Sequence, residues 1–540
     1  MDRWKPVDTL SDREKRLLKF AKSRKLFEFL RLKRSTIFSD EFQQELESMY
    51  RNNGQGEEPR FPAALAMTVV IQSYLQVSDA EAIRLSATDA CWRVVLGTLE
   101  HEEPICSLST FQDFRARLIR HEKDLAFIKR TVDLAKESGL FDPKKLEKGL
   151  RTAVDSRPFE GAGRVEDTFN LLGHAASKIV KIIARKWQMD VDDVCAQART
   201  PLFAGSSIKA SLDVDWNDSE QKSDALRRLC NEVDRLMRWV DTAIEGMLIF
   251  PLVPYIEALK QVKAQDVETG PEGQLQLRQG VAEDRRISIE DPEMRHGRKS
   301  KSKKFNGFKQ FVETDLDTEL TLSCAVQPAN RPEDEATPQL QLDLKVTTGV
   351  EVIEAHVDRA FVNSTLAQNQ RATGGEVICK PWNSRNNAGD FFKKTDFKLD
   401  MRSNTITCPA GEVERFEAGE VVHFDPEACG ACVLRGKCTK AASGRGRSIS
   451  IGEDEGLQKK LRKLQTTSKG RERLRERVEV EHELAHLSNR QGPKARYRGV
   501  RKNLFDLRRL SAVRNLQVIA RFEEEQAEAA EAQNGSQRAA

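Results

Sequence analysis

The 540-residue sequence contains no apolar run that approaches the roughly 20 residues of a membrane-spanning helix. Its N-terminal stretch also lacks the apolar core of a signal peptide. We therefore expect a cytoplasmic protein with no membrane partner, whose ten cysteines are kept reduced. Neither sign of charge dominates, because 88 basic residues oppose 84 acidic ones for a net charge of +4. A charged partner therefore has to be inferred from where the charges cluster.

The composition is that of a globular chain, with 39% hydrophobic and 32% charged residues, and the length predicts roughly three or four domains. Residues 1–135 show short helical patterns. Ser109 and Gln112 form a capping-box pattern, which predicts that a helix begins there. Apolar and basic side chains then occupy opposite faces of this helix, with Phe111, Phe114 and Leu118 on one face and Arg117 and Arg120 on the other. Such an arginine face suits a helix laid on DNA, and it suits any surface helix equally well.

Two apolar segments far apart in the chain each finish at an aspartate, the first at Asp155 and the second at Asp358. Between them we predict a helical stretch, a β-hairpin with its turn near Asp315 to Thr318, and a helix that begins near Pro332. Strands mixed with helices predict an α/β sheet, and functional sites in such sheets gather at strand ends. A strand-end aspartate is, however, most often a turn former.

A third acid comes from the segment 471–490, which reads as one amphipathic helix with several glutamates. On a helical wheel of about 100° per residue, only Glu481 falls inside the apolar arc. This arc is formed by Leu474, Val478 and Ala485. A buried carboxylate is costly unless it is paired or bound to a metal. The alternative to a metal ligand is an ion pair with Arg477, one turn earlier, at the helix edge.

Asp155, Asp358 and Glu481 together supply the ligands that a two-metal phosphoryl-transfer site requires. Mg²⁺ prefers carboxylate oxygens, keeps several waters and takes substrate phosphate as a further ligand. Two such ions about 4 Å apart stabilise the attacking and leaving oxygens of the transfer. We therefore predict that these carboxylates hold two Mg²⁺ or Mn²⁺ ions.

Four cysteines carry a separate signal with the spacing C-x20-C-x2-C-x5-C, namely Cys408, Cys429, Cys432 and Cys438. Four thiolates that include one C-x2-C pair suit a tetrahedral structural Zn²⁺. The segment that contains them is loop-like and poor in apolar residues, which favours a metal that holds it together. The alternative is a set of reduced thiols without metal.

Two stretches dense in positive charge mark the predicted DNA path. Residues 295–309 contain no acid, and residues 490–509 contain a single one. Neutralising DNA phosphates would give strong, salt-sensitive binding, whereas the usual alternative for a charge run is a solvated loop. The residues that we expect to contact DNA are Arg298, Lys299, Lys301, Lys303, Lys304, Arg496, Arg498, Arg501 and Lys502.

Several segments spread over most of the chain carry a family resemblance: "STFQDFRARL", "AVDSRPFEGAGRVEDTFNLL", "VDRAFVN" and "RVEVEHELAH". Together they resemble a bacterial insertion-sequence DDE transposase with an RNase H-like catalytic domain. The resemblance implies a catalytic triad of Asp155, Asp358 and Glu481, and it adds Arg477 to the DNA contacts. It also implies that a homodimer, associated with the bacterial nucleoid, cuts and joins DNA at the terminal repeats of a mobile element and at a target.

The family signature Tyr-x2-Arg-x3-Glu-x6-Lys is only half kept. Arg477 and Glu481 match it, but Leu474 stands in place of the tyrosine and Ser488 in place of the lysine. These departures leave the acids intact and affect the DNA contacts that the signature implies. Asp291 lies in a family-like stretch and is a further candidate acid.

The expected layout is an α/β chain with an RNase H-like mixed sheet. Its predicted parts are a helical DNA-binding domain (1–135), a first RNase H-like segment (145–164), a helical insertion with a linker (165–287), a second RNase H-like segment (288–395), a cysteine-rich zinc-binding insertion (396–450), C-terminal helices with the third acid (451–521) and a low-complexity, disordered tail (522–540).

The predicted function is that of a transposase that binds the ends of its mobile element and performs metal-dependent cleavage and strand transfer. One alternative is a DDE-type DNA nuclease without strand transfer. The other is a catalytically inactive, transposase-derived DNA-binding regulator, against which the intact acids argue.

Overall fold

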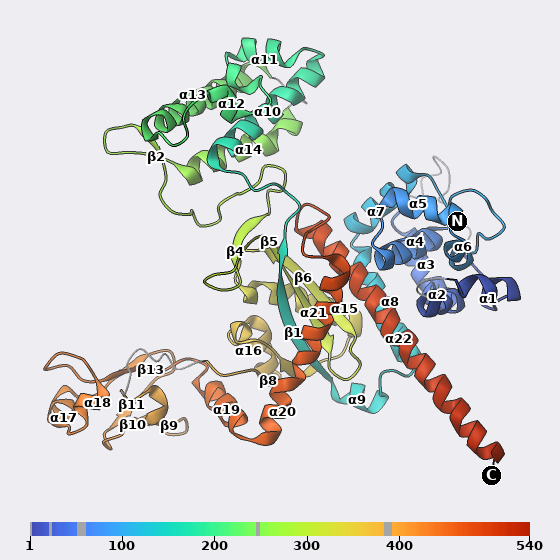
Figure 1. The fold of residues 1–540 in the computed structure, drawn as a ribbon. Coiled ribbons are helices and arrows are strands. Elements are labelled where there is room, and N and C mark those ends of the chain that lie inside the picture. Colours follow the sequence, from blue (N-terminus) through green and yellow to red (C-terminus); the bar gives the residue numbers. More distant parts are fainter. Residues whose placement is uncertain (1–2, 21–23, 51–60, 245–248, 383–390, 540) are drawn as a thin grey trace.

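The computed structural model describes residues 3–20, 24–50, 61–244, 249–382 and 391–539, and its centre is a mixed sheet (Figure 1). The strand order is β4-β5-β1-β7-β8, and β6 pairs with β5. The strands are β1 (Leu150–Glu160), β4 (Arg295–Arg298), β5 (Lys304–Asp315), β6 (Thr321–Pro328), β7 (Val352–His356) and β8 (Glu376–Ile378). β1 is antiparallel to β5 and parallel to β7, which is parallel to β8. The predicted α/β class and the predicted hairpin, formed by β5 and β6, are confirmed.

Neighbouring residues of the central strands point into different apolar clusters, as alternation along a strand requires. Ala153 and Val312 belong to the cluster that contains helices α21 and α22 and the N-terminal helices, whereas Val154 and Phe311 belong to a second cluster with α16 and α19. The sheet is therefore covered on both faces. The helices and 3₁₀ turns around it are η3 (Glu333–Ala336), α15 (Thr337–Thr348), η4 (Arg359–Phe361), α16 (Thr365–Ala372), η5 (Lys394–Asp396), α19 (Glu455–Thr466), α20 (Ser468–Glu476), α21 (Val478–Gln491) and α22 (Val500–Ala539).

The N-terminal region is helical, as predicted, and shares its core with the sheet. Its helices are α1 (Asp12–Leu18), α2 (Arg24–Ile37), α3 (Asp40–Glu47), α4 (Pro62–Leu75), α5 (Asp79–Thr88), α6 (Ala90–Leu96), α7 (Leu108–Arg120), α8 (Lys123–Glu137) and α9 (Pro143–Lys148). Helix α7 does not begin at Ser109 as predicted. Ser107 is its cap, because the Ser107 hydroxyl accepts the backbone N–H of Thr110 at 3.1 Å.

Residues between β1 and β4 form a helical body with its own apolar core, seen at the top of Figure 1. Its elements are α10 (Thr168–Trp187), α11 (Val191–Ala198), η1 (Pro201–Phe203), α12 (Ile208–Leu212), α13 (Ser219–Ala243), α14 (Ile249–Asp266), β2 (Val267–Thr269) and β3 (Leu275–Leu277). The helical character is as predicted. The stretch predicted as a linker instead contains the β2–β3 hairpin, whose strands pair through Val267 and Leu277.

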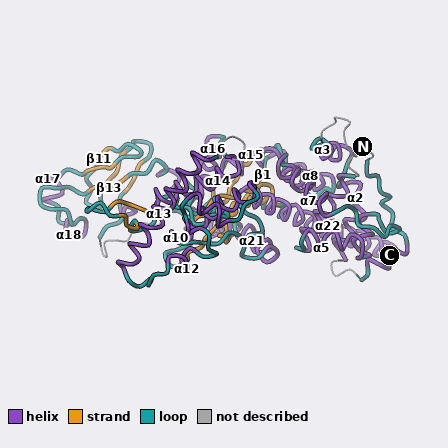
Figure 2. The backbone as a smooth tube through the Cα atoms, turned by 90° about the horizontal axis from the view of Figure 1, so that it is seen from above, coloured by secondary structure: helices purple, strands orange, loops and turns teal. Residues whose placement is uncertain are grey.

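The cysteine-rich region forms a small body of short strands and helices, with β9 (Lys398–Asp400), β10 (Thr405–Thr407), β11 (Val413–Arg415), β12 (Val421–His423), α17 (Pro426–Ala431), α18 (Arg435–Cys438) and β13 (Ser448–Ser450). It has a small apolar cluster of its own that includes Phe397, Ile406 and Phe424, so the region that was predicted to be loop-like contains packed strands and helices. Figure 2 shows this body and the N-terminal helices at opposite ends of the molecule, with the sheet between them.

The predicted disordered tail is instead the continuation of α22, which runs to Ala539 and extends away from the rest of the molecule in Figure 1. Its Ala, Glu and Gln residues are strong helix formers, so a polar low-complexity composition does not prevent a helix here. No helix among the described residues is long and apolar enough to cross a membrane.

Candidate active site

One cavity of about 550 Å³ is lined by all three predicted acids, Asp155, Asp358 and Glu481. Asp155 belongs to β1, Asp358 follows β7, and Glu481 belongs to α21. Three elements that are distant in the sequence therefore bring their carboxylates to one place.

The two aspartates line the same cavity because β1 and β7 run parallel and in register. The last paired residues of this ladder are Ala153 and His356. Asp155 and Asp358 each follow two residues later, so they leave the ladder at the same level. Pairing of β1 with β7 thus places the two aspartates at the same level of neighbouring chain segments.

The prediction that the first strand ends at Asp155 is wrong. β1 continues to Glu160 because its other edge stays paired with β5, where Asp155 lies opposite Val312 and Pro158 lies opposite Lys309. Asp155 is therefore at the end of the ladder with β7 and in the middle of the ladder with β5.

Asp358 also forms a turn, as the alternative reading of a strand-end aspartate suggests. One of its carboxylate oxygens accepts the backbone N–H of Arg359 at 2.7 Å and caps the 3₁₀ helix η4. The residue is exposed and still lines the cavity. Turn formation orients the carboxylate and does not exclude a role as a ligand.

Glu481 lines the cavity, but the prediction that it lies inside an apolar arc is wrong. Its side chain is 49% exposed, whereas Glu483 is buried and pairs with Arg514 at 2.9 Å. The single helix that we predicted is broken at Arg477, between α20 and α21, and within α21 the arc that contains Val478, Glu481 and Ala485 faces outward. The buried apolar face of α21 consists of Val480, Leu484 and Leu487.

Arg477 lies at this break and links two of the acids. Its guanidinium is 3.1 Å from the Asp155 carboxylate and 2.7 Å from the Glu481 carboxylate. The Arg477–Glu481 ion pair considered as an alternative is therefore present, and it includes Asp155. Burial raises the pKa of Asp155, and the nearby positive charge of Arg477 opposes this rise. A cation is needed here to offset the repulsion between carboxylates, and a divalent metal ion would meet the same need.

A fourth carboxylate, that of Glu333, also lines the cavity and was not predicted from the sequence. It accepts a hydrogen bond from the Ser156 hydroxyl at 3.1 Å and lies 3.9 Å from the Lys309 ammonium group. Burial raises the pKa of Glu333, and the charges of Asp358 and Asp155 raise it further. Glu333 is the first of three consecutive acids, and nothing in the sequence indicates which of them faces the sheet.

The first basic stretch lies beside the acids. Arg298, at the end of β4, and Lys299 line the same cavity. Lys301, Lys303 and Lys304 are exposed next to them. The predicted DNA contacts of this stretch therefore lie beside the acids.

The cations of the second basic stretch mostly have binding partners within the protein. Arg496 donates to the backbone oxygen of Gln76, Arg498 pairs with Glu290 at 2.6 Å, and Arg501 pairs with Asp124. Asp124 is fully buried and needs a cationic partner, which Arg501 and Arg508 provide. Of the predicted contacts here, Lys502 is exposed and has no side-chain ion pair or hydrogen bond within the described residues. The cations of the first stretch are therefore more accessible to a ligand than those of the second.

Of the two arginines on the predicted arginine face of α7, one contacts another side chain of the protein and the other is exposed. Phe111, Phe114 and Leu118 are buried, as predicted. The Arg117 guanidinium stacks on the ring of Tyr50 at 4.7 Å, and Arg120 is exposed.

The further candidate acid, Asp291, does not belong to the site. It is buried, it is absent from the residues that line the cavity, and its carboxylate accepts the backbone N–H of Gly499 at 3.2 Å. Through this hydrogen bond Asp291 fixes the segment that leads into α22.

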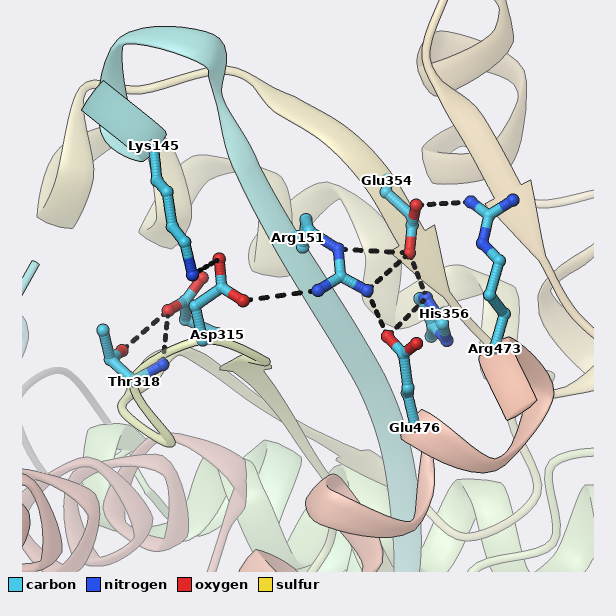
Figure 3. Close-up of polar contacts among 9 residues, drawn as sticks. Lys145, Arg151, Asp315, Thr318, Glu354, His356, Arg473 and Glu476 are labelled. Atoms are coloured by element: carbon cyan, nitrogen blue, oxygen red, sulfur yellow. Dashed lines mark hydrogen bonds and ion pairs between the residues drawn. The ribbon is translucent and has the colours of Figure 1, made fainter. Parts of the chain in front are cut away.

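A second group of acids lies next to the site and is shown in Figure 3. Glu354 and His356 come from β7 and Glu476 from α20, and in the described part of the chain they alone place three possible ligand atoms within 4.8 Å of one another. Arg151 bridges Glu354 and Glu476, and Arg473 also pairs with Glu354. Burial raises the pKa of Glu354, but hydrogen bonds from His356, Arg473 and Arg151 lower it to about 2. Because both carboxylates already have cationic partners, this group is better described as an ion-pair network that ties α20 to the sheet.

The four predicted zinc ligands, Cys408, Cys429, Cys432 and Cys438, line one cavity of about 370 Å³. Burial raises the pKa of Cys438, and the other three cysteines, being close to it, raise it further. The chain therefore gathers four thiols, none of them in a disulfide, at one place.

Two parts of the chain match known protein families. Residues 407–520 match the family described as Transposase DDE domain, and residues 18–117 match the family described as Transposase domain (DUF772). The first match includes Glu481 and the four cysteines, but neither aspartate. No curated protein and no solved structure gives a significant match.

Proposed function

We propose, since the chain is an insertion-sequence DDE transposase, that the cavity containing Asp155, Asp358 and Glu481 is its catalytic centre. The observation that carries this proposal is the convergence of three acids from separate elements on one cavity that also contains Arg298 and Lys299. The mixed sheet beneath it is taken to be RNase H-like.

The side chains present fit divalent cations. Asp155, Asp358 and Glu481 would hold one or two Mg²⁺ or Mn²⁺ ions, and Glu333 lies close enough to add an oxygen. When bound, such ions polarise the attacking oxygen and stabilise the leaving one. A structural Zn²⁺ would be held by the four thiols of Cys408, Cys429, Cys432 and Cys438.

The cationic side chains position the DNA. Arg298 and Lys299 neutralise backbone phosphates that enter the cavity from the β4 side. Arg477, which pairs with Asp155 and Glu481 in this structure, can donate instead to a non-bridging oxygen of the reacting phosphate. Its charge would then stabilise the negative charge that develops there.

The proposed reaction has two steps at this site. A water oxygen bonds to the phosphorus at the element end, the bond to the 3′ oxygen breaks, and a free 3′-OH results. That 3′ oxygen then bonds to a phosphorus of the target DNA, whose own 3′ oxygen leaves. The substrates are the terminal repeats of the element and the target DNA, held by a homodimer.

The DNA on either side of the gene provides the direct test. Full-length protein with Mg²⁺ should cut labelled fragments of this flanking DNA at their border with the element and join the new 3′ ends to a plasmid. Cleavage without joined product would favour a nuclease. Binding without cleavage would favour an inactive regulator. Either result would contradict the proposal.

A further inference from the structure

A second cavity, of about 570 Å³, adjoins the candidate active site. It shares Asp358, Arg477 and Glu481 with the first cavity, and these residues form the wall between the two. The first cavity extends toward β1, β4 and β5, whereas the second extends toward β8 and α20. Asp358 and Glu481 therefore have a cavity on each side of them.

The second cavity is basic. Its cations, besides Arg477, are Lys380, Arg471 and Arg475. Among the described residues that line it, the only carboxylates are Asp358 and Glu481 of the shared wall. The neighbouring acids Glu354 and Glu476 are held by Arg151 in the ion-pair network and leave the cations of this cavity free.

Two of these three cations, Lys380 and Arg475, form no side-chain ion pair or hydrogen bond within the described residues, whereas Arg471 does. Arg471 donates to the backbone oxygens of Thr466 and Gln465 at 3.0 and 3.3 Å and so caps the C-terminal end of α19. Lys380 and Arg475 are exposed, and neither has an ion-pair or hydrogen-bond partner for its side chain within the ranges that the structure describes. Exposed cations without partners beside a reactive centre are available for an anionic ligand.

The register of the parallel strands places Lys380 level with the two aspartates. His356 of β7 pairs with Ala153 of β1 and with Ile378 of β8, and Asp155, Asp358 and Lys380 each follow two residues later. Neighbouring strands lie about 4.8 Å apart, so Asp155 and Lys380 are roughly 10 Å apart across the sheet. Arg298 lies on the other side of Asp155, beyond β5 and displaced along the strands, in the cavity that both residues line. A single DNA backbone can therefore contact both groups of cations while one of its phosphates lies at the acids.

We propose that the DNA strand crosses the three acids from one cavity to the other, and that Lys380 and Arg475 bind its phosphates beyond the reacting one. The inference rests on the proposed function, because it extends the DNA path through that same site. A reacting phosphodiester necessarily has nucleotides on both of its sides. The first cavity holds one of these sides, and the second cavity, with its unpaired cations, holds the other.

The test measures how salt weakens the binding of DNA by the full-length protein. Fluorescently labelled duplexes from the DNA flanking the gene are titrated without added Mg²⁺ or Mn²⁺ and without chelator, so that cleavage is prevented and a bound zinc is retained, at several salt concentrations. Lys380→Ala and Arg475→Ala should each reduce the slope of log affinity against log salt by about 0.9, the value for one phosphate contact, and weaken binding several-fold. Lys469→Ala is the matched control, because Lys469 is an exposed cation on the same helix α20 and lines neither cavity.

The outcomes separate this inference from the proposed function. If Lys380→Ala and Arg475→Ala keep the wild-type slope while wild-type protein cuts the flanking DNA, the second cavity is not part of the DNA path and the catalytic proposal stands. The inference also fails if Lys469→Ala reduces the slope as much, because the effect would then be one of general charge. A wild-type protein that neither binds nor cuts the DNA overturns both.

Discussion

Glu481→Gln is expected to abolish Mg²⁺-dependent cleavage and joining while leaving DNA binding largely intact. The substitution keeps the shape of the side chain and removes the charge that would hold a divalent ion on the cavity wall. The expected loss is more than about 100-fold, since even partners behind metal ligands contribute about 10–100-fold. The measurement is cleavage and joining of labelled flanking DNA by purified variants, and Asp155→Asn should behave in the same way.

Glu479→Gln is the matched control for this experiment. Glu479 lies two residues away on the same helix, is exposed, and lines neither cavity, so its substitution should be nearly neutral. Glu483 would be a poor control, because it is buried against Arg514 and breaking such a pair costs about 3–5 kcal/mol. Full activity in Glu481→Gln with loss in Glu479→Gln would show that the third acid is misassigned.

Cys429→Ser is expected to lower zinc content and thermal stability together. The four thiols line one cavity, and a metal bound there would join the loop around Cys408 to α17 and α18. The apolar cluster of this region is small, so loss of the metal should release the whole region. A loss of only about 1 kcal/mol lowers the melting temperature of a domain of 60–100 residues by roughly 4–8 °C.

Elemental analysis and a thermal melt of the same samples check this expectation. Cys91→Ser is the control, because Cys91 lies in the N-terminal helices and its thiol contacts the backbone oxygen of Leu17 at 3.5 Å, a contact that serine can keep. Wild-type protein that is folded and active without zinc would contradict the zinc assignment.

The location of the two aspartates at one edge of the sheet could be predicted from the sequence. Asp155 and Asp358 each follow an apolar run, and parallel strands bring such positions to the same edge of a sheet. The end of β1 could not be predicted in the same way. Whether a strand continues depends on its partner, and β5, which holds β1 beyond Asp155, is far away in the sequence.

Glu481 was assigned correctly to the cavity for a reason that proved wrong. The helical wheel shows two adjoining apolar arcs, and the arc that packs on the core is that of Val480, Leu484 and Leu487, so Glu483 is the buried glutamate. The density of positive charge along the sequence is also a poor guide to which cations are free to bind DNA. It marked Arg498 and Arg501, which have acidic partners inside the protein, and it overlooked Lys380 and Arg475, which stand in less basic stretches. Partners from distant segments decide these cases.

The location of bound Mn²⁺ tests the central claim most directly. Crystals of the full-length protein soaked in Mn²⁺ should show anomalous scattering in the cavity, with the metal about 2.0–2.3 Å from carboxylate oxygens of Asp155 and Asp358. Arg477 should then have moved away from at least one of its carboxylate partners. Mn²⁺ bound instead by Glu354, His356 and Glu476, with none beside Asp155, would contradict the assignment of the catalytic centre.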